Sequence, residues 1–153
     1  MNSPKDARIA QLEMKDSKLF RQQCYVGGAW LDADDKSTIA VRNPADGAAL
    51  GTVPRMGVAE TRRAIAAADA AFPAWRAKTA KERSLILRRW FELMMANQED
   101  LAQIMTAEQG KPLTESRGEI AYAASFIEWF AEEASASTAT PSRSTRPTSA
   151  SWC

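Results

Sequence analysis

The chain has 153 residues, of which 45% are hydrophobic and 25% charged, and its formal net charge is +1. This composition is typical of a globular domain with its own core, and the near-neutral charge gives no electrostatic basis for binding a nucleic acid or a membrane surface. No apolar run approaches the roughly 20 residues that span a bilayer, and the first residues lack the apolar segment of a secretory signal. We therefore expect a cytoplasmic protein with no nucleic-acid and no membrane partner.

The sequence contains no histidine and two cysteines, Cys24 and Cys153. The missing histidine excludes His-based acid–base catalysis, the Ser-His-Asp and Cys-His nucleophile systems, and His-containing metal sites in this chain. Two cysteines make no disulfide framework, and we interpret them as reduced, unrelated thiols.

Short strands are predicted in the first third of the chain, after a polar arm at residues 1–17. Gly27-Gly28 separates two runs of aromatic and β-branched residues, which predicts a hairpin of residues 24–26 and 29–31. No helix start follows these glycines, so a turn is favoured over a phosphate-binding loop. Residues 38–42 and 50–53 form a second candidate pair around a Pro-Ala-Asp-Gly turn.

From Val58 onward the apolar residues recur at helical spacing. Pro73 is predicted to break or bend the first helix near its end. One face of this helix carries Ala64, Ile65, Ala68, Ala71, Phe72 and Trp75.

A second helix is predicted to begin at the capping box Thr79-Ala80-Lys81-Glu82. Arg88-Arg89 lies on its polar side, as Arg62-Arg63 does on the helix before, which favours solvated faces over an anion site. Its apolar stripe consists of Ile86, Leu87, Trp90, Phe91, Leu93 and Met94.

Two further helices are predicted before the composition changes. Asn97 is predicted to cap the third helix, and Gly110 is predicted to close it. Thr114 opens the fourth helix, which reaches about Ala134 and directs Ile120, Ala123, Ala124, Ile127 and Phe130 inward. Many glutamates lie along these helices, but no base, metal ligand or nucleophile converges with them, so chemistry alone identifies no active site.

The order of these segments is distinctive. NPADGAALGTVP is followed by an Ala-rich helix ending in A-F-x-x-W and by a capped helix leading to EQGKP. In this order, residues 18–134 resemble the amino-terminal part of the aldehyde dehydrogenase superfamily. The stretches KLFRQQCYVGGAW and TAEQGKPLTESRGEIAYAASFIEWFAEEA are most similar to the succinate-semialdehyde dehydrogenase branch.

The resemblance implies a two-domain α/β, homo-oligomeric enzyme that oxidises a small aldehyde with NAD or NADP. A cysteine thiolate, a glutamate and an asparagine carry that chemistry in the family. Their motifs, and those that hold the cofactor, come later than residues 18–134, which would supply only the short strands and three to four helices of an incomplete cofactor-binding domain. Neither Cys24 nor Cys153 matches the nucleophile, and we expect no catalytic residue, no cofactor-binding residue and no metal site here, and weak binding of NAD or NADP at best.

One pair of residues can be carried over from the family. The helix from Glu115 to Ala134 matches a helix that lines the substrate tunnel, and Tyr122 and Phe126 lie four residues apart on one of its faces. The resemblance therefore implies that both are tunnel residues, with ordinary core packing as the alternative.

The last segment, residues 135–153, differs from the rest, because ten of its residues are Ser or Thr and it contains no acid. Such a segment is predicted to be disordered, and a regulatory tail is one interpretation. Another is a shifted reading frame. If one nucleotide is restored after codon 134 and synonymous codons are chosen for the tail, the neighbouring frame can encode KRIYGDTIPEHQADKRLMV. This string is similar to the family's next segment. We favour an out-of-frame product.

Two functions remain open at this stage. The chain is either a truncated aldehyde dehydrogenase that is inactive alone, or a helical interaction module that docks onto a full-length relative. In both cases its apolar stripes are wider than its own helices can cover, which predicts exposed hydrophobic surface and marginal stability.

Overall fold

The computed structural model describes residues 12–136. Short strands are followed by four longer helices, as predicted. In chain order the elements are the 3-10 helix η1 (Ser17–Leu19), the strands β1 (Cys24–Val26), β2 (Ala29–Leu31), β3 (Thr38–Arg42) and β4 (Ala49–Pro54), and the helices α2 (Val58–Ala77), α3 (Ala80–Ala96), α4 (Gln98–Gln109) and α5 (Leu113–Ala136).

The strands form two separate antiparallel hairpins, which confirms both predicted pairs. Gly27 and Gly28 join β1 to β2 with φ values of 58° and 87°, a left-handed backbone that glycine adopts without a steric penalty. In the β3–β4 turn, the side chains of Asn43 and Asp46 accept hydrogen bonds from backbone N–H groups two residues further on. Neither hairpin is joined to a larger sheet within residues 12–136.

The helix boundaries follow local capping chemistry. The predicted capping box is present: Thr79 Oγ1 accepts from the Glu82 N–H at 3.2 Å, and Glu82 Oε2 accepts from the Thr79 N–H at 2.7 Å. Gly110 closes α4 with φ at 73°, also as predicted.

Two local predictions hold only in part. Pro73 does not break α2, which continues four residues beyond it to Ala77. Asn97 occupies the N-cap position of α4, as predicted, but its side chain makes no capping hydrogen bond there. It donates to the Leu93 carbonyl at the end of α3, while its backbone carbonyl accepts the first bond of α4 from Leu101.

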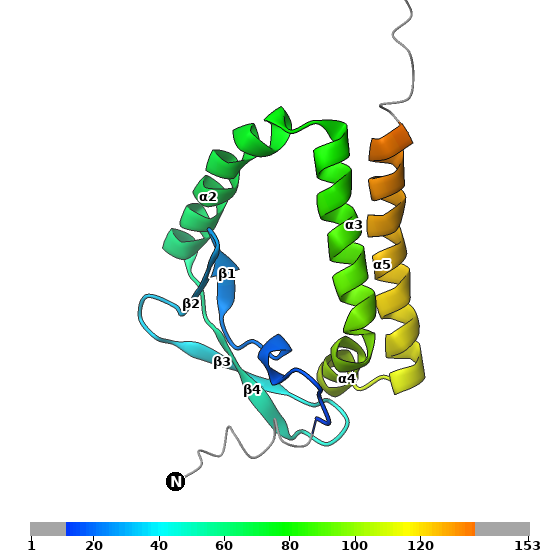
Figure 1. Ribbon diagram of the computed structural model, residues 1–153. Coiled ribbons are helices and arrows are strands. Elements are labelled where there is room, and N and C mark those ends of the chain that lie inside the picture. The colour runs from blue at the N-terminus through cyan, green and yellow to red at the C-terminus, as the bar shows by residue number, and fades with distance from the viewer. Residues whose placement is uncertain (1–11, 137–153) are drawn as a thin grey trace, which may run out of the picture.

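The core lies where α5 packs against α3 and α4 (Figure 1). Ser84 of α3 donates to the Ala131 carbonyl of α5 at 2.7 Å, and the hydroxyls of Thr106 and Ser116 join α4 to α5 at 2.8 Å. The buried apolar residues are mostly small: Ala33, Ala102, Ala107, Ile120, Ala124 and Ala131. Alanines let helices approach closely but bury little area, so among the described residues Ile120 is the largest apolar side chain in the core.

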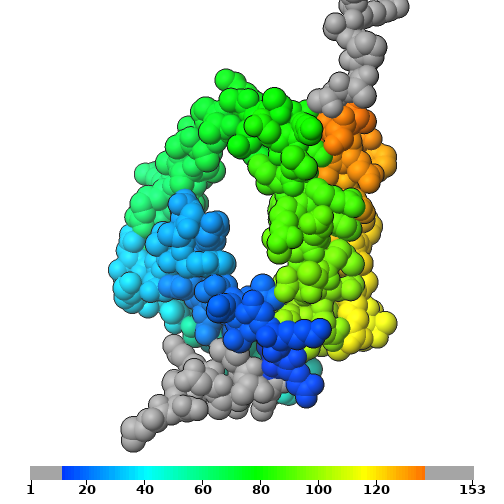
Figure 2. All heavy atoms as spheres, viewed as in Figure 1, coloured from blue at the N-terminus to red at the C-terminus, as the bar shows by residue number. Residues whose placement is uncertain are grey.

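The elements are arranged as an open ring. α2 and the β1–β2 hairpin form one side, the α3–α5 pair forms the other, and α4 with the β3–β4 hairpin joins them (Figure 1). The space inside stays open when all heavy atoms are drawn (Figure 2). Arg63 of α2 binds Asp34 with two hydrogen bonds of 2.7 and 2.9 Å, which connects α2 to the loop after β2.

The predicted segment boundaries fall partly outside the described residues. Residues 1–11 of the predicted arm and residues 137–153 of the predicted tail, Cys153 included, lie there. Within the described range, α5 continues through Ser135 to Ala136, two residues beyond the boundary predicted at Ala134.

Candidate functional site: the two apolar faces of the α3–α5 pair

α3 has an apolar face that no other described element covers. Ser84 and Arg88 bind α5, and they mark the side of α3 that faces that helix. Ile86, Trp90 and Leu93 are spaced four and three residues apart and lie on the opposite side of the helix. Their side chains are 45%, 55% and 44% exposed. Because α5 lies on one side of α3 and the ring opening on the other (Figure 1), these residues, which we call the inner face, border the opening.

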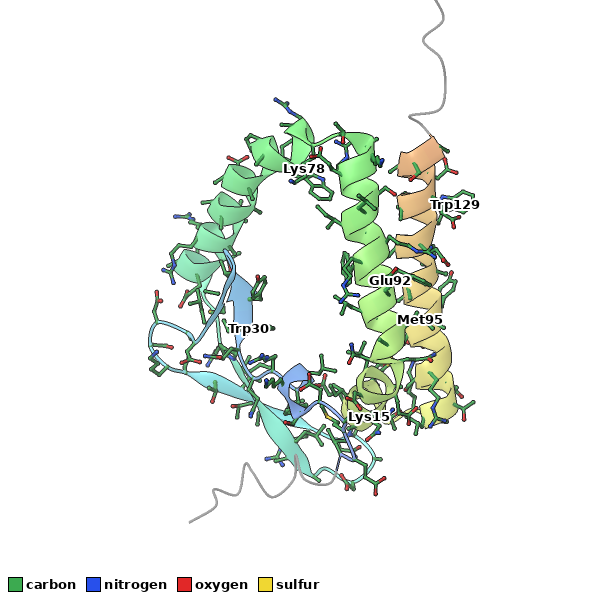
Figure 3. The ribbon with its side chains drawn as sticks, in the orientation of Figure 1. Lys15, Trp30, Lys78, Glu92, Met95 and Trp129 are labelled. Atoms are coloured by element: carbon green, nitrogen blue, oxygen red, sulfur yellow. The ribbon has the colours of Figure 1, made fainter. Side chains whose placement is uncertain are left out.

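α5 has a second such face on the other side of the pair. Tyr122, Phe126 and Trp129 lie opposite the residues that pack on α3 and α4, and all three are exposed. The rings of Tyr122 and Phe126 meet edge to face, with centroids 4.8 Å apart and an interplanar angle of 75°. Figure 3 shows Trp129 directed away from α3. We call these three residues the outer face.

The exposure confirms one expectation and corrects others. Hydrophobic surface is exposed, as predicted from the width of the stripes. Phe130 and Ala123 were predicted to point inward and are exposed instead, whereas Ile120 and Ala124 are buried as predicted. The face predicted on α2 is also open, since its residues Ile65, Phe72 and Trp75 are exposed. Periodicity predicted the apolar residues of α2 and α3 correctly but could not show which of these faces have a partner among the described residues.

Arg88 and Arg89 of α3 both lie beside carboxylates. Arg88 binds Glu128 at 2.8 Å, and its guanidinium carbon lies 5.2 Å from the ring centroid of Phe91, within reach of a cation–π contact. Arg89 binds Glu92 at 3.5 Å. These guanidinium groups are engaged by carboxylates, and an anionic ligand would have to displace them.

One polar connection was not predicted from the sequence: the carboxylate of Asp100 joins α4 to the segment before η1. This side chain is buried in the first turn of α4 and accepts hydrogen bonds from the backbone N–H groups of Lys15 at 2.9 Å and Asp16 at 2.8 Å. These N–H groups, that of Asp16 first, hold the pKa of Asp100 below its ordinary value. An acidic residue in the first turn of a helix was the available signal, but its partners lie more than eighty residues away in the sequence.

An ion pair connects α4 to α5. Arg117 donates two hydrogen bonds, of 2.7 and 2.8 Å, to the carboxylate of Glu99. The pair lowers the pKa of Glu99 and raises the pKa of Arg117. Both side chains are partly exposed, so the pair adds little to stability.

The NPADG turn and the EQGKP stretch meet at Gly110. An added Cβ at Gly110 would lie 2.8 Å from Cγ of Pro44, so the end of α4 packs directly on the β3–β4 turn. A largely apolar hollow of about 280 Å³ lies beside this contact, lined in part by Leu12, Gln103 and Leu113.

Catalytic and metal-binding groups do not gather in the described residues. Cys24 is half-buried in β1 and forms no disulfide among the described residues. No group of three His, Cys, Asp or Glu side chains within residues 12–136 could hold a metal ion. In the same range no helix is long and apolar enough to cross a bilayer.

Comparison with known proteins identifies the fold from which these elements come. The family model described as "Aldehyde dehydrogenase family" matches residues 30–151, a range that extends past Ala134. The chain belongs to the aldehyde dehydrogenase family. It is 72% identical over 123 residues to the glutarate-semialdehyde dehydrogenase of Pseudomonas putida. The matched residues make up 80% of this chain and 26% of that protein. It is 64% identical over 122 residues to the NADP(+)-dependent succinate-semialdehyde dehydrogenase of Escherichia coli, with coverage of 80% and 25%.

A solved structure of a relative has the same fold over this segment. The succinate-semialdehyde dehydrogenase of Burkholderia pseudomallei superposes with a TM-score of 0.77 at 65% identity, over 79% of this chain and 25% of that one. The resemblance to this branch of the family is thereby confirmed, with the glutarate-semialdehyde enzymes beside the succinate-semialdehyde enzymes. The chain spans about a quarter of the length of the curated relatives that it matches.

Proposed function

We propose that this chain forms the N-terminal part of a cytoplasmic, NAD- or NADP-dependent dehydrogenase that oxidises a dicarboxylic semialdehyde, succinate or glutarate semialdehyde, to the corresponding acid. The observation that carries this proposal is the combination of 64–72% identity to two such enzymes with two apolar faces that the chain leaves uncovered. A free-standing domain rarely exposes so many large apolar side chains.

The one glycine pair of the described residues that resembles a phosphate loop supports the proposal that this chain holds no dinucleotide cofactor by itself. Gly27-Gly28 connects two strands of a hairpin and precedes no helix N-terminus that could hold a pyrophosphate. When bound to a complete enzyme, NAD(P)⁺ accepts a hydride. We attribute no step of that reaction to residues 12–136, and we propose that this chain alone binds the cofactor weakly and is inactive.

The outer face of α5 is our candidate for the aldehyde path. Tyr122 and Phe126 hold each other in an edge-to-face pair, so their rings form an ordered apolar wall before any ligand arrives. The methylene chain of a semialdehyde could lie against such a wall, and a truncation there would remove contact area from the substrate. Assembly into a homo-oligomer, which the resemblance also implies, stays a prediction.

The alternative is a non-catalytic module that docks onto a full-length relative. The same uncovered faces favour it, because they could be occupied by a separate polypeptide. One experiment separates the two functions. Only the enzyme function predicts that activity appears when this segment is joined covalently to the rest of a relative.

The test is a chimera in which residues 18–134 replace the matching segment of the E. coli enzyme. We expect the purified chain to form no NADPH from succinate semialdehyde and the chimera to form it. In the chimera, Tyr122→Ala and Phe126→Ala should each raise KM for the semialdehyde by about tenfold, equivalent to about 1.4 kcal/mol. Tyr25→Ala is the matched control, since Tyr25 is 62% exposed, close to the 66% of Tyr122, and lies in β1.

Two results would contradict the proposal. An inactive chimera that is folded would argue against an enzyme function for this segment. An active chimera in which the Tyr122 and Phe126 variants behave like the Tyr25 variant would remove the outer face from the aldehyde path.

A further inference from the structure

We propose that residues 12–16, which we call the strap, form a lid over the apolar hollow at the end of α4, and that the carboxylate of Asp100 is the clamp that keeps this lid closed. The proposal does not depend on the aldehyde oxidation proposed above. It concerns a conformational device within the described residues, a segment that opens while the helices stay folded.

The clamp uses both carboxylate oxygens of Asp100. Oδ1 accepts a hydrogen bond from the Lys15 N–H at 2.9 Å, and Oδ2 accepts one from the Asp16 N–H at 2.8 Å. Figure 3 shows Lys15 beside α4. The Asp100 side chain is only 2% exposed and lies in the first turn of α4, where the helix dipole favours a negative charge. Because hydrogen bonds to an ionised acceptor are about twice as strong as those between neutral groups, these two bonds are the main attachment of the strap to α4.

The rest of the strap is held more weakly. A longer hydrogen bond between neutral groups joins the Gln103 side-chain amide to the Glu13 carbonyl at 3.3 Å. Leu12 and Met14 are half-buried, and the alternate residues Glu13 and Lys15 are exposed. Two half-buried side chains contribute little burial energy, so the strap should open readily once the clamp is lost.

The strap runs antiparallel to α4 along one face of that helix. Asp100, Gln103 and Ala107 are spaced three and four residues apart, so they share one side of α4 over a length of about 10 Å. The carboxyl-terminal end of the strap meets Asp100, and Glu13 meets Gln103 one turn further along. The clamp and the hollow therefore lie at opposite ends of the same contact.

The amino-terminal end of the strap reaches the hollow. Leu12 lines it together with residues from the β3–β4 turn, from α4 and from the start of α5, among them Ala45, Ala107 and Leu113. The volume is about 280 Å³, and the wall is largely apolar. When the strap leaves α4, Leu12 leaves this wall and the apolar surface becomes accessible.

The chain just beyond the strap is fixed, which gives the opening a defined end. Gln22 Oε1 accepts a hydrogen bond from the Thr52 N–H of β4 at 2.8 Å. The Phe20 ring lies over Gly51, since an added Cβ at Gly51 would be 3.2 Å from Cε1 of Phe20. The strap can therefore swing away from α4 while the chain after η1 stays in place.

The experiment measures hydrogen exchange of the Lys15 and Asp16 amides in the full chain by NMR, at urea concentrations well below the unfolding midpoint. We expect both amides to exchange at least about tenfold faster than the amide of the buried Ile120, and with little dependence on urea, because a local opening exposes little surface. In Asp100→Asn one acceptor oxygen is replaced by a donor group, and both amides should exchange about tenfold faster again.

Glu99→Gln is the matched control. It also removes a carboxylate charge from the first turn of α4, but the Glu99 carboxylate binds Arg117 of α5 and not the strap. The Lys15 and Asp16 amides should therefore exchange in this variant as they do in the unmodified chain.

A second measurement tests whether the strap covers the hollow. Ala107 is 8% exposed, so Ala107→Cys, in a chain that also carries Cys24→Ser and Cys153→Ser, places a thiol in the wall of the hollow. We expect this thiol to react slowly with a water-soluble disulfide reagent, and about tenfold faster when Asp100→Asn is added.

The proposal is overturned if the Lys15 and Asp16 amides share the rate and the urea dependence of the Ile120 amide, because the strap would then open only on global unfolding. It is also overturned if Asp100→Asn accelerates them no more than Glu99→Gln does. Equal reaction of the thiol with and without Asp100→Asn would show that the strap covers nothing. The amide measurement retains Ala107, so it decides the proposal even if Ala107→Cys fails to fold, and neither measurement depends on enzyme activity.

Discussion

Gly110→Ala tests whether the end of α4 packs directly on the β3–β4 turn. Gly110 has φ at 73°, so alanine would cost about 1 kcal/mol for the left-handed backbone alone. The new Cβ would also lie 2.8 Å from Cγ of Pro44, a proline ring atom with little freedom to move, and relief of such overpacking costs about 1–3 kcal/mol. We expect Gly110→Ala to lower the free energy of unfolding by about 2–4 kcal/mol, measured by urea denaturation with an unchanged m-value.

Gly47→Ala is the control for this measurement. Gly47 lies in the β3–β4 turn, on which Gly110 packs. Its φ is 72°, and no atom lies within 4 Å of an added Cβ. This variant should show the backbone cost alone, about 1 kcal/mol. Equal losses in the two variants would refute the packing of Gly110 on Pro44. A partial recovery of Gly110→Ala by Pro44→Ala, beyond the sum of the single changes, would confirm it.

Three further predictions concern stability. Thr79→Ala removes the capping box of α3 and should cost about 1 kcal/mol of unfolding free energy by urea denaturation; no loss would show that the box does not hold the helix start. Asp100 has a lowered pKa in the folded state, so its carboxylate stabilises the fold above the ordinary pKa of an aspartate, and this stabilisation is lost as the pH falls through the lowered value. The urea midpoint should therefore fall more steeply in acid for the unmodified chain than for Asp100→Asn, and parallel curves would contradict the contact. Ile120→Ala should cost about 2–5 kcal/mol because Ile120 is buried, whereas Trp129→Ala should change stability by no more than about 0.5 kcal/mol because its ring is exposed; the reverse order would mean that α5 packs through its other face.

Local structure was predictable where a short stretch of sequence determines it. The Gly27-Gly28 hairpin, the capping box at Thr79 and the left-handed Gly110 all depend on residues within four positions of one another. Asn97 shows the limit of this reasoning, because an asparagine between two helices can serve either one, and hydrogen-bond geometry selected the end of α3.

Contacts between distant segments were not predictable in the same way. Asp100 and its partner Lys15 belong to regions that look unrelated in the sequence. For the candidate site, periodicity placed Phe130 on an inward face together with Ile120, yet only Ile120 is buried. α5 has apolar residues on two opposite sides, and a single apolar face at helical spacing cannot describe such a helix. Tyr122 and Phe126 came from the family resemblance, and their place on the aldehyde path stays a proposal.

Hydroxyl-radical footprinting of Trp90 and Trp129, read residue by residue by mass spectrometry, tests most directly whether this chain is one part of a larger enzyme fold. The two side chains represent the inner and the outer face, and both are more than half exposed. We predict rapid oxidation of both in the isolated chain and strong protection of both in the chimera with the E. coli enzyme. Protection of either tryptophan in the isolated chain, or undiminished oxidation of both in the chimera, would contradict the account.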